Sequence, residues 1–327
     1  MKKGSFFSIS IKKNDKGVAE VVGAILIFAV LITLFTSFMV WYIPAQTTAN
    51  ETHYEVQNKA ALGTMVSNLH SPSITTGSTI SSTVPLGIAG VAIFSQATDT
   101  QFSILPQDTG FNASVSAVLL LNLTNTSGVI SSHFVNFSYN ITGLMGTLGS
   151  TEYITAINYL IEDGTLFQVY GNNQPSDSLG PLPLGITGSA ATPSVSLVAM
   201  GITGQSEIFS STSSEVVNLL VNTSTFHDFS NGSIVAFSGK EYTIDNMSLH
   251  SLKYTFNGAM ANAWNYAFFS QYNSSRIPFD TLVSLSGWNF TGLPFAASSL
   301  NTSFSISLQK YVSLNSFNSQ YLTYRGD

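Results

Sequence analysis

The chain of 327 residues contains no cysteine and few charged side chains. Without cysteine there is no disulfide framework, no thiolate nucleophile and no zinc–thiolate site. Charged residues make up 9% of the chain, against about 25% in an average soluble domain. Only 11 residues are basic, and five of these precede residue 17, so we expect no basic face for nucleic acid. The composition also argues against an ordinary cytosolic enzyme.

Hydroxyl and amide side chains replace the missing charges. Serine and threonine together account for 80 residues, while 39 residues are aromatic. This content of apolar and aromatic residues is the reverse of a disordered composition. We therefore expect a folded chain whose surface is covered by neutral polar groups.

The first 43 residues combine a basic segment with a long apolar run. The basic leader, residues 1–17, carries Lys2, Lys3, Lys12, Lys13 and Lys16. The apolar run, residues 18–43, has 23 consecutive uncharged residues from Val21 onward. As a helix these would extend about 34 Å, enough to cross the hydrocarbon core of a bilayer. The run predicts a single transmembrane helix.

Flanking residues predict the orientation of this helix. All five leader lysines lie on its amino-terminal side, whereas Glu51 and Glu55 follow it. Trp41 and Tyr42 lie where interfacial aromatic residues are common. By the positive-inside rule, the amino terminus is cytoplasmic and the remaining chain lies outside the cell membrane. An ordinary cleaved secretory signal fits less well, because its apolar region is usually about 7–15 residues long.

The junction at Gly17 resembles a known processing signal. Lys16-Gly17 directly precedes the apolar run, and Glu20 follows Gly17 by three residues. This pattern resembles the class III signal of type IV pilins, and the run DKGVAEVVGAILIF is most similar to archaeal pilin-like proteins, including uncharacterised haloarchaeal membrane proteins. The resemblance implies that a prepilin-type peptidase cuts between Gly17 and Val18, leaving the helix on the mature protein. Bacterial pilins place the glutamate at the fifth mature position, whereas here it is the third.

Glu20 permits two interpretations. It can be an interfacial carboxylate that reaches water, or it can meet the new amine of Val18 on a neighbouring subunit during assembly. An unpaired carboxylate inside a membrane is costly, and this favours a partner. Both interpretations stay open.

Residues 44–70 predict an amphipathic continuation of the helix. Pro44 can kink it at the bilayer surface. Leu62, Met65, Val66 and Leu69 follow the i, i+3, i+4, i+7 spacing of one helical face. We expect this stripe to pack on the protein's own domain, with a neighbouring subunit as the alternative. Ser71-Pro72-Ser73 should end the helix.

Residues 71–327 predict a mostly antiparallel β ectodomain, sandwich-like, with one short packed helix, so that the fold class is α+β. Expected strands are Leu86–Phe94, Ser114–Leu123, His133–Ile141, Val195–Ile202, Val216–Val221 and Ser303–Tyr311. Asp163-Gly164 predicts a hairpin turn. A Pro/Gly-rich loop, Gly171–Gly185, suggests a subdivision near 171–190. The short helix should span Met260–Phe268 and start at Asn257.

The order of these segments extends the resemblance over most of the chain. The apolar helix is followed by the INYLIEDGTLFQVYG hairpin, by TPSVSLVAMGITG and by an AWNYAFF helix, as in the haloarchaeal pilin-like proteins. The resemblance implies a topology, but no specific biochemical role.

No catalytic or metal-binding pattern is present. The sequence lacks HExxH, GxSxG, P-loop and EF-hand motifs, and its five histidines share no ligand spacing. We therefore predict no enzyme activity, no catalytic residue, no metal and no cofactor.

Asparagine sequons are about twice as frequent as expected. Chance predicts about six Asn-x-Ser/Thr matches, and the chain has twelve. They are Asn50, Asn112, Asn122, Asn125, Asn136, Asn140, Asn222, Asn231, Asn246, Asn273, Asn289 and Asn301. They predict N-glycosylation of an exterior surface, although Ser/Thr-rich turns also collect asparagine.

Two functions fit these features. The first is a pilin-like structural or adhesive surface protein, whose partners are the lipid bilayer, a prepilin-type peptidase, other pilin-like subunits and assembly machinery. The alternative is an uncleaved single-pass surface glycoprotein with a binding or sensor ectodomain.

A long stretch without basic residues permits two interpretations. A Ser/Thr/Asn surface can simply replace ions, as in many secreted β proteins, or the domain can be adapted to acid outside the cell. From Ala60 to Gly239 there is no lysine or arginine, while nine acidic residues occur. Protonation of carboxylates below about pH 4 would bring this stretch close to neutrality. A domain rich in basic residues would instead become strongly positive.

Overall fold

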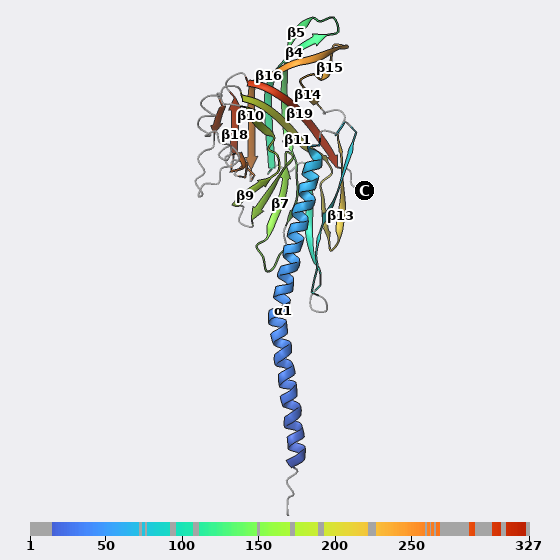
Figure 1. Cartoon of the computed structure of the whole chain (residues 1–327), viewed down its shortest axis with the longest axis vertical. Helices are drawn as coiled ribbons and strands as arrows, with labels where there is room; N and C mark the ends of the chain where they lie inside the picture. The colour runs from blue at the N-terminus through green and yellow to red at the C-terminus, as the bar shows by residue number, and fades with distance from the viewer. Residues whose placement is uncertain are drawn as a thin grey trace, which may run out of the picture.

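The structure is a computed structural model that describes most of the chain after the leader. The described residues are 15–71, 74–75, 77–91, 96–106, 111–148, 151–170, 174–188, 193–221, 227–258, 260–261, 263–264, 266–268, 288–291, 303–308 and 312–324. Most of the basic leader, together with Asn222, Asn273 and Asn301, lies outside these residues. Figure 1 shows one long helix that projects from a β-rich body.

Helix α1 (Asp15–Leu69) is continuous over 55 residues. Pro44 lies inside it without ending it, and the Thr48 hydroxyl donates to the Pro44 carbonyl at 2.8 Å. The helix ends as expected just before Ser71. We call residues 19–43 the apolar half and residues 44–69 the packed half.

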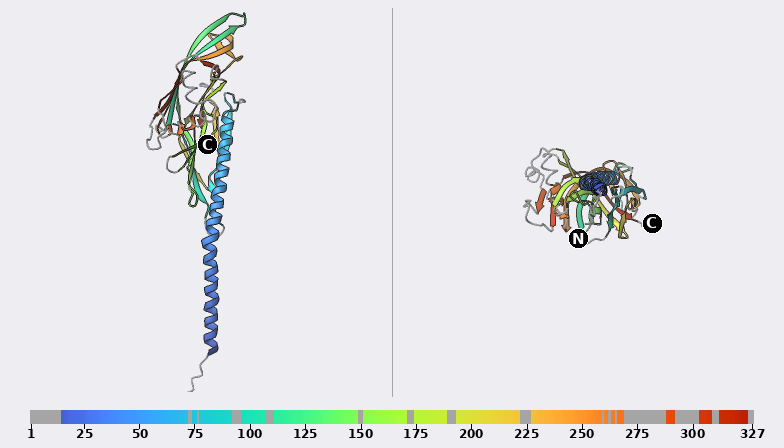
Figure 2. Two further views of the ribbon diagram at one scale, coloured as in Figure 1. Left: turned by 60° about the vertical axis from the view of Figure 1, so that its left-hand side comes forward. Right: turned by 90° about the horizontal axis from the view of Figure 1, so that it is seen from below.

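The apolar half is exposed on nearly all sides, and Trp41 is 77% accessible. Among the described residues, α1 is the single helix that is long and apolar enough to cross a membrane, a property that a signal sequence near the amino terminus shares. The packed half lies against the β region (Figure 2).

In the described residues, nineteen strands follow the helix. They are β1 (Thr79–Pro85), β2 (Gly87–Ile88), β3 (Thr98–Leu105), β4 (Phe111–Asn125), β5 (Ile130–Thr142), β6 (Leu144–Leu148), β7 (Ile157–Glu162), β8 (Thr165–Tyr170), β9 (Gln174–Leu179), β10 (Leu184–Gly188), β11 (Pro193–Gly204), β12 (Glu207–Ser211), β13 (Ser214–Val221), β14 (His227–Ser230), β15 (Ile234–Phe237), β16 (Lys240–Gly258), β17 (Trp288–Thr291), β18 (Ser303–Leu308) and β19 (Val312–Tyr324). A few described residues between 261 and 268 form the one short helix. The α+β class with a mostly antiparallel β region is thus confirmed, whereas the sandwich-like arrangement stays a prediction.

The described strands form two sheets. A twelve-stranded sheet has the path β1-β13-β19-β16-β18-β17, with β4, β5, β10, β11, β14 and β15 as branches. A seven-stranded sheet has the path β12-β3-β6-β7-β8-β9, with β2 paired to β3. All described pairings are antiparallel except β11 with β19.

Alternating burial explains the long strands. In β4 the residues at odd positions from Ala113 to Leu123 are buried, and the residues between them are at least partly accessible. A strand places successive side chains on opposite faces, so β4 covers one core cluster with its odd face. Trp264 from the short helix lies in the same cluster, as expected.

A second cluster joins α1 to the β region. Leu62, Met65, Val66 and Leu69 are all buried there, against residues of β1, β3, β6, β7 and β13. The expected packing of the stripe on the protein's own domain is confirmed. Burying one such side chain contributes about 1.5–3 kcal/mol.

Three sequence predictions differ from the structure. Of the strand expected at Leu86–Phe94, the described residues form only the short β2, and residues 92–94 lie outside the described residues. Asn257 does not start a helix, because β16 continues through it to pair with β4 and β18. The loop predicted at Gly171–Gly185 contains β9 and the start of β10, since backbone pairing outweighs its Pro/Gly content.

Candidate functional site

The packed half of α1 carries a buried polar face directly before its apolar stripe. Glu51, Tyr54, Glu55 and Asn58 are all buried, at the same i, i+3, i+4, i+7 spacing. We call these four residues the polar seam. They place a row of hydrogen-bonding groups between the helix and the sheets.

Glu51 anchors the segment between β6 and β7. One carboxylate oxygen accepts the backbone N–H of Glu152 at 2.7 Å, and the other accepts those of Tyr153 and Ile154, both at 3.0 Å. Hydrogen bonds to an ionised carboxylate are roughly twice as strong as neutral ones. Glu51 therefore binds helix and loop together at the point where the helix enters the β region.

Tyr54 and Asn58 extend the seam into the seven-stranded sheet. The Thr100 hydroxyl donates to the Leu86 carbonyl at 2.7 Å, so the Tyr54 hydroxyl is the donor in its 2.7 Å contact with Thr100. The Asn58 amide donates to Thr147 at 2.8 Å. Burial raises the pKa of Tyr54 to about 12, which keeps this hydroxyl protonated.

Glu55 is the poorly solvated member of the seam. Neither of its carboxylate oxygens has a hydrogen-bond partner of good geometry among the described residues. Burial raises its pKa to about 7, the nearby Tyr159 hydroxyl offsets part of this rise, and the charge of Glu51 adds to it. Glu55 thus takes up a proton far above the usual carboxylate range.

The β7–β8 turn lies buried beside the end of α1. The Asp163-Gly164 turn has the expected hairpin geometry, with positive φ at both residues (49° and 71°). Both Glu162 and Asp163 are buried, although hairpin turns usually face water. The Trp264 indole donates to Glu162 at 2.5 Å, and the Met200 backbone N–H donates to Asp163 at 2.6 Å.

One oxygen of each turn carboxylate has no hydrogen-bond partner among the described residues. Burial raises the pKa of Glu162 to about 7 and that of Asp163 well above its usual value, while the bonds from Trp264 and Met200 offset part of these rises. The folded state therefore favours protonated, neutral turn carboxyls.

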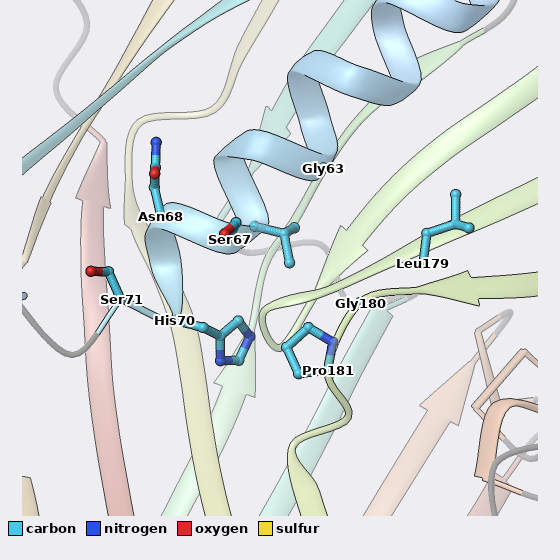
Figure 3. Close-up of a pocket in the computed structure, with 9 residues that line it drawn as sticks. Gly63, Ser67, Asn68, His70, Ser71, Leu179, Gly180 and Pro181 are labelled. Atoms are coloured by element: carbon cyan, nitrogen blue, oxygen red, sulfur yellow. The ribbon is translucent and has the colours of Figure 1, made fainter.

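His70 connects the turn to a pocket. Its Nε2 lies 2.8 Å from the Gly164 carbonyl, so Nε2 carries the proton. Burial lowers the pKa of His70 and favours this neutral form. Figure 3 shows the ring beside Pro181, at a pocket of about 480 Å³ between the end of α1 and the β9–β10 connection.

The pocket and the seam contain few groups for chemistry. The pocket walls are Gly63, Val66, Ser67, Asn68, His70, Ser71, Leu179, Gly180 and Pro181. None of these residues is charged when His70 is neutral. Among the described residues no three His, Asp or Glu side chains come together as a metal site. The arrangement fixes a helix on a sheet and takes up protons.

The predicted processing residues lie at the start of α1. Gly17 and Val18 are in its first turn, and Glu20 is exposed near the start of the apolar half. Nothing else in the described residues tests Glu20, so both interpretations of this residue stay predictions.

The sequon asparagines lie in different environments. The side chains of Asn112 and Asn289 are outside the described residues, as are Asn222, Asn273 and Asn301. Asn136, Asn140, Asn231 and Asn246 are exposed.

At least four of the sequon side chains form hydrogen bonds with their neighbours. The Asn50 amide donates to the carbonyls of Ala89 and Gly90, at 2.8 and 3.2 Å. The Asn122 amide donates to Asn246 at 2.7 Å. The Asn125 side-chain oxygen accepts two backbone N–H groups of the β4–β5 turn. Glycosylation replaces one of the two N–H bonds of the side-chain amide, so a glycosylated Asn50 could not keep both of its hydrogen bonds.

Sequence reasoning missed the polar seam and the buried turn carboxylates. Glu51 and Glu55 served only to orient the membrane helix, yet they share the face of Leu62 and Leu69. That shared periodicity was the available signal. For Glu162 and Asp163 no comparable signal exists, because a turn carboxylate normally faces water.

Comparison of the chain with protein-family models, with curated proteins and with solved structures finds no match. Its functional interpretation therefore depends on its own residues and geometry.

Proposed function

We propose that this chain is a pilin-like cell-surface protein with a structural or adhesive role. The apolar half of α1 would lie in the cell membrane with the amino terminus in the cytoplasm, and the β region would stand outside. A prepilin-type peptidase would remove the leader after Gly17, before assembly with other pilin-like subunits.

One observation supports this proposal above all others. A single uninterrupted helix combines an exposed apolar half with a half that packs on the β region. Large apolar side chains exposed on all sides are unfavourable in water but favourable in lipid or against other apolar helices. A stalk fixed to its domain by the polar seam suits display or assembly.

Mapping the amino terminus of the native protein by mass spectrometry tests the proposal. We expect a mature start at Val18, and we expect the Gly17→Val variant to retain residues 1–17, because the peptidase must approach the backbone closely there. Equal retention of the leader in both proteins would contradict the pilin-like function.

An intact leader would support the alternative, an uncleaved single-pass surface glycoprotein with a binding or sensor ectodomain. Exposed sequons such as Asn136 and Asn231 favour this candidate. Glycopeptide mass spectrometry that finds every sequon bare would contradict it.

A further inference from the structure

Strand β5 is a long edge strand without the usual protection. Among the described strands it pairs only with β4, and it has 13 residues. Every other described strand with a single neighbour has seven residues or fewer. Unpaired backbone groups along an edge are a template for another strand, and proteins usually block them with charge, proline or a cover.

Two other edges, those of β1 and β9, show such protection. β1 ends in Pro85 and lies against α1, and β9 contains Pro175 and Asp177. β5 contains no proline and no acidic or basic residue except His133. Its carboxyl-terminal end is approached by β11, where Gly143 lies against Ile202, so only its first half is open.

The register shows which backbone groups face outward. The Asn125 N–H donates to the Val129 carbonyl at 3.1 Å, and the β4–β5 pairing continues from this bond. In an antiparallel pair the bonded positions alternate, so odd residues of β5 bond to β4. The backbone groups of Ile130, Ser132, Phe134 and Asn136 point away from β4, and we call these four residues the open edge.

We propose that the open edge pairs with the open edge of a second copy of this chain, in antiparallel orientation. Such pairing would be the mechanism of the adhesive role proposed above. The inference rests on that proposed function, because the β region must be displayed outside the membrane. The edge carries no like charges that would repel in self-pairing.

A register centred on Phe134 pairs Ser132, Phe134 and Asn136 of the open edge with open-edge residues of the second copy. It places Phe134 opposite Phe134 of the second copy, and Ser132 opposite Asn136. Phe134 and Ile130 are 61% and 69% exposed in the single chain. Aromatic residues opposite one another stabilise a strand pair.

The position of the edge determines the geometry of the pair. The β4–β5 hairpin stands at the end of the molecule opposite the apolar half of α1 (Figures 1 and 2). Antiparallel pairing at this end points the two helices in roughly opposite directions. The pair would therefore connect two facing membranes rather than neighbours in one membrane.

Vesicle tethering tests this inference on the full chain. The protein is made in a host that adds no N-glycans and is reconstituted in lipid vesicles, with outward orientation checked by protease access. We expect wild-type vesicles to cluster in light scattering. Phe134→Lys and Phe134→Glu should each reduce clustering at least roughly tenfold, because like charges then face one another.

Mixing vesicles that carry Phe134→Lys with vesicles that carry Phe134→Glu should restore clustering, because opposite charges then meet. Ile234→Lys is the matched control: Ile234 is also 69% exposed but lies on β15, so this variant should cluster as the wild type does. Three results would each overturn the inference. The first is an absence of clustering of wild-type vesicles, the second is clustering of both Phe134 variants at the wild-type level, and the third is a failure of the mixed variants to cluster. Clustering does not depend on cleavage of the leader. A negative clustering result is therefore distinguishable from a failure of the proposed processing after Gly17.

Discussion

The two halves of α1 have similar lengths but opposite surroundings. The apolar half exposes hydrophobic side chains on nearly all sides, whereas the packed half buries one face against β1, β2, β7 and β8. Hydrophobic content alone would rank the apolar half as the buried one. The comparison shows that periodicity, including that of carboxylates and amides, indicates which half of a helix packs on protein.

The two halves also differ in how they are stabilised. The apolar half depends on its environment, because it makes few contacts within the chain. The packed half combines an apolar stripe near its end with the polar seam before it. Substitutions in the two halves should therefore have very different effects on the free energy of unfolding of the β region.

The largest difference is expected for leucine truncation. Leu62→Ala should lower the free energy of unfolding by about 2–5 kcal/mol, since Leu62 is fully buried in the second cluster. Leu31→Ala in the apolar half should leave it unchanged, because Leu31 is exposed. Denaturant unfolding of the detergent-solubilised chain measures both. Equal effects would show that the two halves are not distinct.

Removal of the Glu51 carboxylate should have the next largest effect. Glu51→Ala leaves three loop N–H groups without their acceptor, and we expect a loss of about 3 kcal/mol. Glu51→Gln should lose less, because it keeps one acceptor oxygen. Lys59→Ala, on the exposed face of the same helix, is the control. The same unfolding assay would contradict the anchoring role if Glu51→Ala behaved like Lys59→Ala.

The raised carboxyl pKa values predict greater stability in acid. Glu55 and Glu162 each have a folded-state pKa of about 7, against an ordinary 4.5. Between these values the folded state binds protons that the unfolded state does not. The contribution of these two carboxyls to the free energy of unfolding is thus fully present below pH 4.5 and is lost as the pH rises through 7. This direction agrees with adaptation to acid, one of the two interpretations of the sequence.

Glu162→Gln tests this pH dependence. The amide stays neutral and can still accept from Trp264, so we expect the variant to be about 3 kcal/mol more stable than the wild type at pH 7.5 and nearly equal at pH 4. Glu241→Gln, at an exposed position of β16, is the control. Unfolding midpoints from pH 4 to 8 provide the measurement, and parallel profiles for wild type and Glu162→Gln would contradict the burial argument.

Local patterns predicted the elements whose partners are close in sequence. The long helix, the stripe at Leu62 and Leu69 and the Asp163-Gly164 turn follow from spacing within about ten residues. Glu51 could have been placed on the same face by extending that spacing upstream.

Long-range pairing lies outside such patterns. That β16 continues through Asn257 depends on β4 and β18, which are distant in the chain. Burial of Glu162 depends on Trp264, about a hundred residues away. Neither contact leaves a local signal. Asn257 alone is typical of a helix start, and Glu162 alone is typical of an exposed turn.

The smallest expected change in stability concerns Asn50, near the start of the packed half. Asn50 lies one residue before the polar seam, and its amide bonds to the carbonyls of Ala89 and Gly90. Asn50→Ala should cost about 1 kcal/mol, whereas Asn231→Ala, in an exposed turn, should cost little. Because a glycan would take one of the two N–H groups that make these bonds, we also expect Asn50 to be bare in the native host and Asn231 to be occupied. Glycopeptide mass spectrometry measures both sites. A fully occupied Asn50 would mean that the packed half begins further along the helix, at Glu51 or beyond.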